Sequence, residues 1–191
     1  MQLDNMLLQA CKNNKKSVVQ TFLKRGGVDV NKRDESGNTP LIYACMKNAR
    51  DLVKMLLDNG ADVNLGNQQD CMPIHFAAET GSPEIIELLT GAGADVNCTD
   101  RNGRTPLMVM ARHGRTDAAL KFIQNHDVDT KIKDSDNHMA IDYATSSGLR
   151  ELVKALSRTE ENHTDAYGNT TLHHACWNEQ GQVVKVLLEN D

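Results

Sequence analysis

The stretch DNGADVN at residues 58–64 decides the fold, because it recurs as GAGADVN at residues 91–97, 33 residues later. A second phrase, GNTPL at 37–41, recurs as GRTPL at 103–107, 66 residues later. Looser copies of that second phrase are CMPIH at 71–75, HMAID at 138–142 and NTTLH at 169–173. A fixed period that covers most of a chain indicates a repeat array.

The copies divide the chain into six units within one domain that spans residues 1–191. The units begin near Asp34, Asn67, Asp100, Asp134 and Asp165, with spacings of 33, 33, 34 and 31 residues. We expect the boundaries to fall at about 1–33, 34–66, 67–99, 100–133, 134–164 and 165–191.

Each unit predicts two short helices. Thr39-Pro40 and Thr105-Pro106 place a hydroxyl at a helix N-cap and a proline at the first helical position. A glycine then permits the left-handed turn that ends this first helix. A second helix follows, with apolar residues at helical spacing, and the unit closes on an extended Asp-Val-Asn segment. Ser82-Pro83-Glu84 is a clear start for one second helix. The turn glycines are Gly81, Gly114 and Gly148.

Such helices are too short to be stable alone, so stacking on neighbouring units must bury a shared core. Small residues end each first helix, and we expect Cys11, Cys45 and Cys176 to be buried structural residues among them. The five cysteines are odd in number and include no CxxC pair, so neither a disulfide framework nor a zinc ribbon is indicated.

The pattern D-x-x-G-x-T-P-L-H-x-A-A-x-x-G, followed by L-L-x-x-G-A-D-V-N, resembles the ankyrin repeat over essentially the whole chain. The resemblance implies an all-α fold, a solenoid of helix-turn-helix units with short β-hairpin fingers that line a concave side together with the first helices. Residues 1–33 look like an N-terminal capping repeat. The unit from Asp134 has Met139-Ala140 in place of Thr-Pro, and its tail at 159–163 has lost the GADVN turn, so we expect local irregularity there.

Composition limits the cellular compartments and the classes of partner that we expect. The net charge of −5 argues against general affinity for nucleic acid, and no apolar stretch is long enough to insert into a membrane. No secretory signal is evident, and scattered cysteines fit a reducing compartment, so we expect an intracellular protein of the cytoplasm or nucleus. The last unit stops where its closing turn should begin, which favours a fragment of a longer chain.

Nothing in the sequence indicates catalysis, so we expect no enzyme activity, no cofactor and no metal site. His75 and His173 occupy the H of TPLH, where the family uses the imidazole to hydrogen-bond neighbouring turns. His173 and His174 are adjacent on a helix and therefore point in different directions, so they do not form a two-ligand metal site. The finger aspartates recur at the repeat period and are predicted to be structural.

Partner contacts are expected where repeats differ and side chains face outward, which the resemblance places on the fingers and at the ends of the first helices. A basic cluster falls on these positions in one unit: Arg101, Arg104, Arg112 and His113, with Arg115 close by. Arginine suits the capture of carboxylate or phosphate groups, whereas the alternative is ordinary solvated charge. Tyr167 and Trp177 supply aromatic contacts, the alternative being that Trp177 packs against the next repeat or lies under a cap. Other predicted contact residues are Met46, Lys47 and Glu79.

These residues predict a protein-interaction module, an adaptor, scaffold or inhibitor that binds a protein or an acidic or phosphorylated peptide. A regulatory array that packs against another domain of its own longer chain is the alternative. The resemblance also implies a substrate for asparagine hydroxylation, at Asn64 and Asn97 of the GADVN turns.

Overall fold

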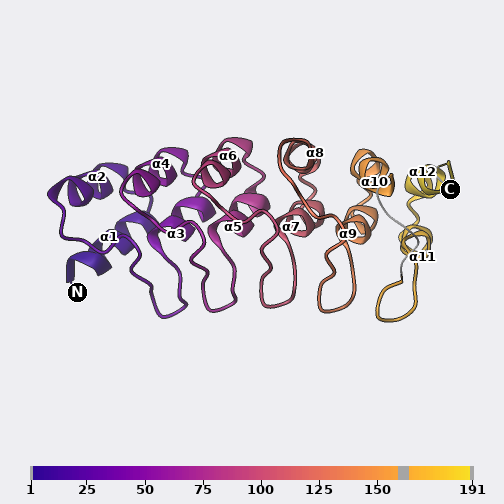
Figure 1. Cartoon of the computed structure of the whole chain (residues 1–191), viewed down its shortest axis with the longest axis horizontal. Coiled ribbons are helices and arrows are strands. Elements are labelled where there is room, and N and C mark those ends of the chain that lie inside the picture. The colour runs from indigo at the N-terminus through magenta and orange to yellow at the C-terminus, as the bar shows by residue number, and fades with distance from the viewer. Residues whose placement is uncertain (1, 159–163, 190–191) are drawn as a thin grey trace. The chain divides into compact units, whose positions relative to one another are not determined.

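A computed structural model describes residues 2–158 and 164–189 of the chain (Figure 1). All regular structure within these ranges is helical, and the chain divides into two compact units, Met1–Asp95 and Val96–Asp191. The dividing point lies inside one of the Asp-Val-Asn turns, so each compact unit contains three pairs of helices.

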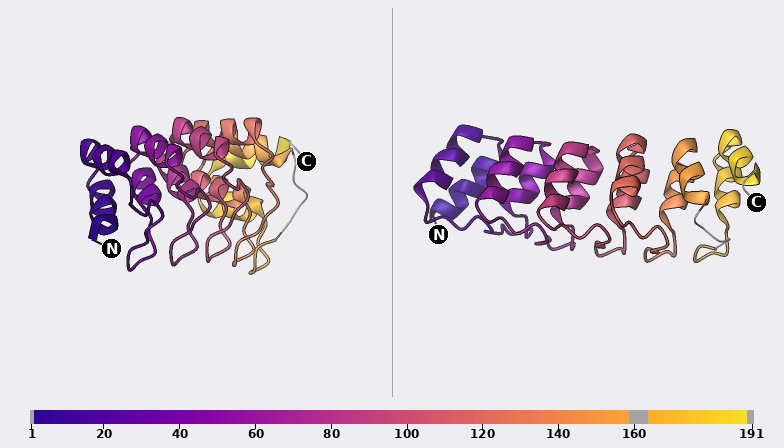
Figure 2. Two further views of the ribbon diagram at one scale, coloured as in Figure 1. Left: turned by 60° about the vertical axis from the view of Figure 1, so that its left-hand side comes forward. Right: turned by 45° about the horizontal axis from the view of Figure 1, so that its top comes forward.

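The first compact unit contains the pairs of the three N-terminal repeats. The first helices pack on one another in one layer, and the second helices form a layer above them, while the connecting loops extend to one side (Figures 1 and 2). Leu41, Ile74, Leu56 and Leu89 are among the side chains fully buried between these layers. The helices are α1 (Gln2–Lys12), α2 (Lys16–Arg25), α3 (Pro40–Met46), α4 (Arg50–Asp58), α5 (Pro73–Thr80) and α6 (Pro83–Gly91).

The second compact unit repeats this arrangement. Its core includes Leu107, Met110, Phe122 and Leu152. The helices are α7 (Pro106–Arg112), α8 (Thr116–Asn125), α9 (Ala140–Ser146), α10 (Arg150–Ser157), α11 (Thr171–Trp177) and α12 (Gly181–Glu189).

The predicted start signals of the first helices are confirmed. Thr39 and Thr105 are N-caps whose hydroxyls accept the amides of Ile42 and Met108, and a proline follows each of them. Ser82 also precedes a helix that begins with proline, but its side chain makes no capping hydrogen bond. The glycines predicted to end the first helices have the positive φ angles that this turn requires.

The Asp-Val-Asn segments differ from the prediction, because they are turns and not extended segments. The carboxylate of Asp62 accepts the backbone amide of Asn64, two residues on, and Asp29 does the same for Asn31. This local hydrogen bond closes an Asx turn, which competes with extended backbone.

The fingers are the loops between one pair of helices and the next. They turn back like hairpins, although no strand is assigned to any of them in the described ranges. Within each compact unit a backbone hydrogen bond joins neighbouring fingers: Gln68 donates to Ser36, Ser135 to Asn102 and Ala166 to Asp136. Gly103 is required at one such approach, since its φ is +76° and an added Cβ would lie 3.0 Å from Cα of Asp134.

The irregularity expected in the unit from Asp134 does not affect its helices. Asp142 stands where other units have histidine, and its carboxylate accepts the amide of Met139, the N-cap residue of α9. The same carboxylate accepts the hydroxyl of Thr171 at the start of α11. Asp142 therefore makes the bond that His75 and His173 make in their own units. Residues 159–163 lie outside the described part of the chain.

The prediction that Cys176 is buried is wrong. Cys11 and Cys45 are buried, but Cys176 is exposed at the corresponding place in α11. In the earlier units the residue at this place lies under the first helix of the next unit, as α3 covers α1 and α9 covers α7. No further first helix follows α11 in the described residues, so nothing of that kind covers Cys176.

Candidate protein-binding surface

Each finger is built around one side chain at its base. Oδ1 of Asp100 accepts the backbone amides of Asn102 and Arg104, two and four residues on. Asp34, Asp134 and Asp165 make the same two bonds in their own fingers, and Asn67 makes them with its amide oxygen. The recurring aspartates are therefore structural, as predicted, because they fix the finger backbone.

The second carboxylate oxygen of these aspartates has a different partner in each unit. The Tyr43 hydroxyl donates to Asp34 and the Tyr143 hydroxyl to Asp134, both at 2.5 Å. In the last unit Nε2 of His174, from the same helix position as the two tyrosines, lies 2.9 Å from Oδ2 of Asp165. Burial raises the pKa of Asp34 and of Asp165, but the hydrogen bonds outweigh it and the pKa of each is lowered overall.

Arg104 is the partner of Asp100. Its Nη2 lies 2.7 Å from Oδ2 of Asp100 and its Nε donates to the same oxygen at 2.9 Å. This ion pair is mostly shielded, and together with the backbone bonds it lowers the pKa of Asp100 although burial acts to raise it. Arg104 was predicted as a partner-binding residue, but its guanidinium already holds the finger of its own unit. The sequence did not reveal this because Arg104 occupies an outward-facing position in the family pattern.

Arg101, Arg112 and His113 have exposed side chains on the same unit. Arg101 follows the base aspartate in the finger, while Arg112 ends helix α7 and His113 is its C-cap, with Nδ1 2.9 Å from the carbonyl of Val109. Burial, the hydrogen bond to Asp134 and the charge of Asp134 raise the pKa of Tyr143. The positive charges of Arg104 and Arg112 act on the same hydroxyl in the opposite direction, so both guanidinium groups contribute to the field there.

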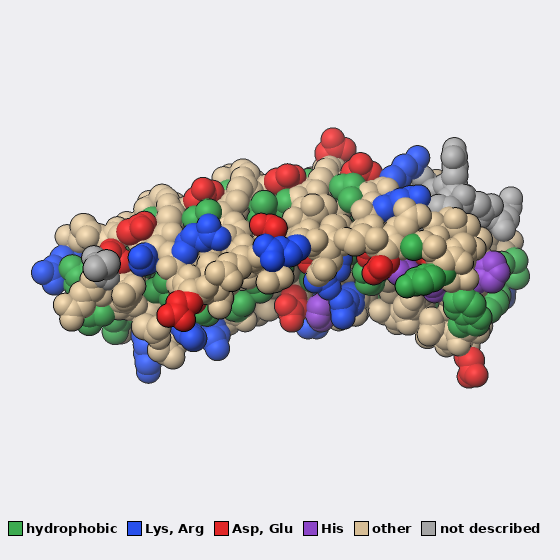
Figure 3. Space-filling model, turned by 90° about the horizontal axis from the view of Figure 1, so that it is seen from below, with side chains coloured by type: hydrophobic (Ala, Val, Ile, Leu, Met, Phe, Trp, Pro, Cys, Tyr) green, Lys and Arg blue, Asp and Glu red, His purple; other side chains and the backbone are tan. Residues whose placement is uncertain are grey.

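The two predicted aromatic contacts lie at the surface of the last unit. Tyr167 is 80% exposed near the tip of its finger, and Trp177 is 64% exposed at the end of α11. The Trp177 ring lies edge-on to that of His174, with ring centroids 5.7 Å apart, and 6.2 Å from His173. Figure 3 shows histidine and apolar side chains grouped on the finger side near the C-terminal end.

The remaining predicted contact residues belong to the first compact unit. Met46 is 38% exposed at the end of α3, with Lys47 as the exposed C-cap residue, and Glu79 is exposed near the end of α5. All three therefore lie at the surface, at ends of first helices.

Asn64 and Asn97, the predicted hydroxylation positions, connect successive turns. The Asn64 amide donates to the carbonyl of Gly93 and accepts the amide of Asp95. Asn97 makes the same two bonds with Asp127 and Asp129. Both side chains thus have a structural role, and their hydroxylation stays a prediction.

The histidines of the TPLH positions cap their own helices. Nδ1 of His75 accepts the amide of Met72, and Nδ1 of His173 accepts that of Thr170. At α11 this bond completes a capping box, because the Thr170 hydroxyl accepts the amide of His173 in return, whereas the side chain of Met72 makes no capping bond at α5.

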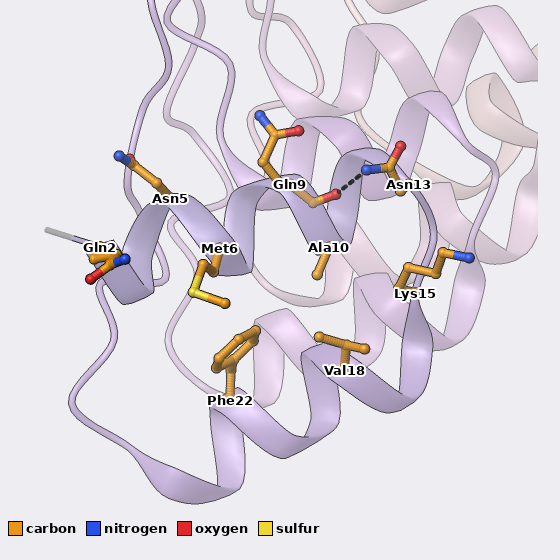
Figure 4. Close-up of a pocket in the computed structure, with 9 residues that line it drawn as sticks. All are labelled: Gln2, Asn5, Met6, Gln9, Ala10, Asn13, Lys15, Val18 and Phe22. Atoms are coloured by element: carbon orange, nitrogen blue, oxygen red, sulfur yellow. Dashed lines mark hydrogen bonds between the residues drawn. The ribbon is translucent and has the colours of Figure 1, made fainter.

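Two features were missed by reasoning from the sequence. The structure brings His138, Asp165 and His174 together, with their ligand atoms within 4.8 Å of one another. An alignment of the units places His138 four residues after the base aspartate of its finger, and it places His174 at the helix position of Tyr43 and Tyr143. An open groove of about 400 Å³ also lies between α1 and α2, where Met6, Phe22 and Val18 present apolar side chains beside polar groups (Figure 4).

Comparison of the chain with models of known protein families identifies the class of protein to which these repeats belong. The model for ankyrin repeats in three copies matches residues 2–67 and 74–164, and the model for a single ankyrin repeat matches residues 167–191. The chain belongs to the ankyrin-repeat family. No curated protein matches it. Ankyrin repeats are generally protein-interaction modules and typically not enzymes, and none of the helices in the described ranges combines the length and apolar character that crossing a bilayer requires.

Proposed function

We propose that this chain binds an acidic or phosphorylated segment of a protein partner through the unit at residues 100–133. The observation that carries the proposal is the exposure of Arg101 and Arg112 on the finger and the first helix of that one unit. Residues 100–133 contain seven Lys or Arg and four Asp, hence a net charge of +3 in a chain whose net charge is −5. A local positive field of this kind attracts anionic groups and selects against cationic ones.

The aromatic side chains of the last unit extend this surface. Tyr167 and Trp177 are large, rigid and accessible, and such residues provide much of the binding free energy at protein interfaces. Arginine forks supply orientation because they bind carboxylate or phosphate oxygens in pairs. The proposed division of roles is therefore charge recognition at residues 100–133 and apolar contact at Tyr167 and Trp177.

Charge reversal at Arg101 and Arg112 tests the proposal. Arg104 is left unchanged, because its replacement would break the ion pair with Asp100 and disturb the finger itself. The double variant Arg101→Glu, Arg112→Glu should weaken binding at least tenfold, roughly 1.4 kcal/mol. This loss of affinity should become larger as the salt concentration falls, because salt screens the charges. Its melting temperature should stay close to that of the unaltered chain.

The measurement is capture of proteins from a cell extract on the immobilised chain, with mass spectrometry and then an affinity determination for the captured partner. Lys121→Glu is the matched control, because Lys121 is an exposed residue of α8 in the same unit and the charge change is the same. Equal retention of the partner by the double variant and the unaltered chain would contradict the proposal.

A further inference from the structure

The group formed by His138, Asp165 and His174 has the composition of a transition-metal site. Nε2 of His174 lies 2.9 Å from Oδ2 of Asp165, and Nε2 of His138 lies 3.6 Å from the same oxygen. Two imidazole nitrogens and one carboxylate oxygen are a donor set that Zn²⁺ accepts. We propose that these three residues bind Zn²⁺, with water completing the tetrahedron.

The distances fit such a site with small adjustments. Ligand atoms about 2.0–2.2 Å from a tetrahedral Zn²⁺ lie about 3.3–3.5 Å from one another. The two observed distances to Oδ2 lie on either side of that range, and all three ligand atoms are within 4.8 Å of one another. Modest rotations of the His138 and His174 rings therefore bring the three donors around one ion.

The surroundings hold the donors in place. The Asp165 carboxylate is buried, and its other oxygen is fixed by the amides of Tyr167 and Asn169. The side chains of His138 and His174 are only 24% and 15% exposed, and their ring centroids lie 5.7 Å apart. Three donors that are ordered before the ion arrives lose little conformational entropy when they bind it.

A second carboxylate, that of Asp134, lies near the other ring nitrogen of His138. Nδ1 of His138 lies 3.7 Å from Oδ1 of Asp134, on the side of the ring away from Asp165. Once Zn²⁺ occupies Nε2, the proton of the ring stays on Nδ1, and the Asp134 carboxylate lies on that side of the ring. When Zn²⁺ binds Nε2 of His174, the proton that this nitrogen holds toward Asp165 moves to Nδ1, so the ring stays neutral as a zinc ligand.

Residues at the equivalent positions of other units show which substitutions remove a zinc ligand and are still compatible with the fold. Tyr43 and Tyr143 occupy the place of His174 and also bond to a finger aspartate. Asn38 and Asn169 occupy the place of His138 in their own fingers. His174→Tyr and His138→Asn are therefore the informative variants. His173→Met is the control, because Met108 occupies the corresponding helix position and its Sδ receives the cap amide.

The experiment uses the full chain without a histidine tag, stripped of metal with a chelator. Zn²⁺ is titrated by calorimetry, and Co²⁺ by its visible absorption and by quenching of Trp177, the chain's one tryptophan, whose ring lies 5.7 Å from that of His174. We expect one equivalent of Zn²⁺ to bind, tetrahedral Co²⁺ bands and quenching of Trp177. His138→Asn and His174→Tyr should each weaken the affinity at least tenfold, and His173→Met should leave it unchanged.

Two results would overturn the site. One is the absence of saturable Zn²⁺ and Co²⁺ binding by the unaltered chain. The other is undiminished affinity in both ligand variants while circular dichroism shows that they are folded. Partner capture by the basic unit is a separate measurement and does not depend on this result.

Discussion

A single backbone position at the end of each first helix has a left-handed conformation. Glycine occupies it in three units, as at Gly114, and asparagine, which tolerates this region, occupies it at Asn14 and Asn48. In the last unit the residue is Glu179, with φ of +54°. A glutamate gains nothing from this conformation and is strained there.

Glu179→Gly should therefore stabilise the last unit. The glycine relieves the strain of the positive φ, and the expected gain in the free energy of unfolding is about 0.5–1 kcal/mol. Urea unfolding followed by the fluorescence of Trp177, two residues away, reports this gain where it occurs. Glu189→Gly, an exposed change near the end of α12, serves as the control; a loss of stability in Glu179→Gly would refute the interpretation.

The finger is the element in which the aspartates act. The hydrogen bonds to Asp34, Asp100 and Asp165 lower the pKa of each carboxyl below the model-peptide value of 3.8, although burial acts against them. A lowered folded-state pKa means that the unfolded chain binds protons first as the pH falls. The stability that the carboxylates contribute is complete above about pH 4 and is lost progressively below it.

We accordingly expect the urea midpoint to fall steeply as the pH is lowered from about 4 toward 2. In Asp100→Asn the amide retains an acceptor for the two backbone bonds but loses the ion pair with Arg104. This variant should be less stable near neutral pH and should lose less stability on acidification. An unaltered pH dependence would show that Asp100 does not contribute to it.

Prediction from sequence succeeded for elements whose signals are local. Thr-Pro caps and turn glycines depend on a few neighbouring residues, so the first helices could be placed from them. The Asp142 cap was missed, because an aspartate three residues after the N-cap substitutes for histidine only through the bond it makes to Met139. The role of Arg104 was missed for a similar reason: outward position was predicted, but an intra-finger ion pair was not.

At the scale of the whole molecule, pairings between units were out of reach of a single sequence. His138 and His174 are 36 residues apart, and only the stacking of one unit on the next brings both to Asp165. The prediction that Cys176 is buried failed for the same reason, since the environment of Cys176 depends on a neighbouring unit and not on its own helix. Period and caps define what each unit is, whereas contacts between units decide what its side chains touch.

The reactivity of the buried cysteines reports local opening of the repeats in which they lie. Cys11 and Cys45 lie in the cores of the first two units, and burial raises the pKa of Cys11 to about 12 and that of Cys45 further still. Only a thiolate reacts readily with a disulfide reagent, so these two thiols become reactive when their own units open. Cys176, exposed on the last unit, should react at once.

The rates at which Cys11 and Cys45 are modified, read by mass spectrometry of the peptides, would thus show which of the first two repeats opens more readily. Modification of Cys45 as fast as that of Cys176 in native buffer would mean that the core of the second repeat opens freely. Well-separated rates for Cys11 and Cys45 would give the first and second repeats separate opening free energies without the introduction of any label.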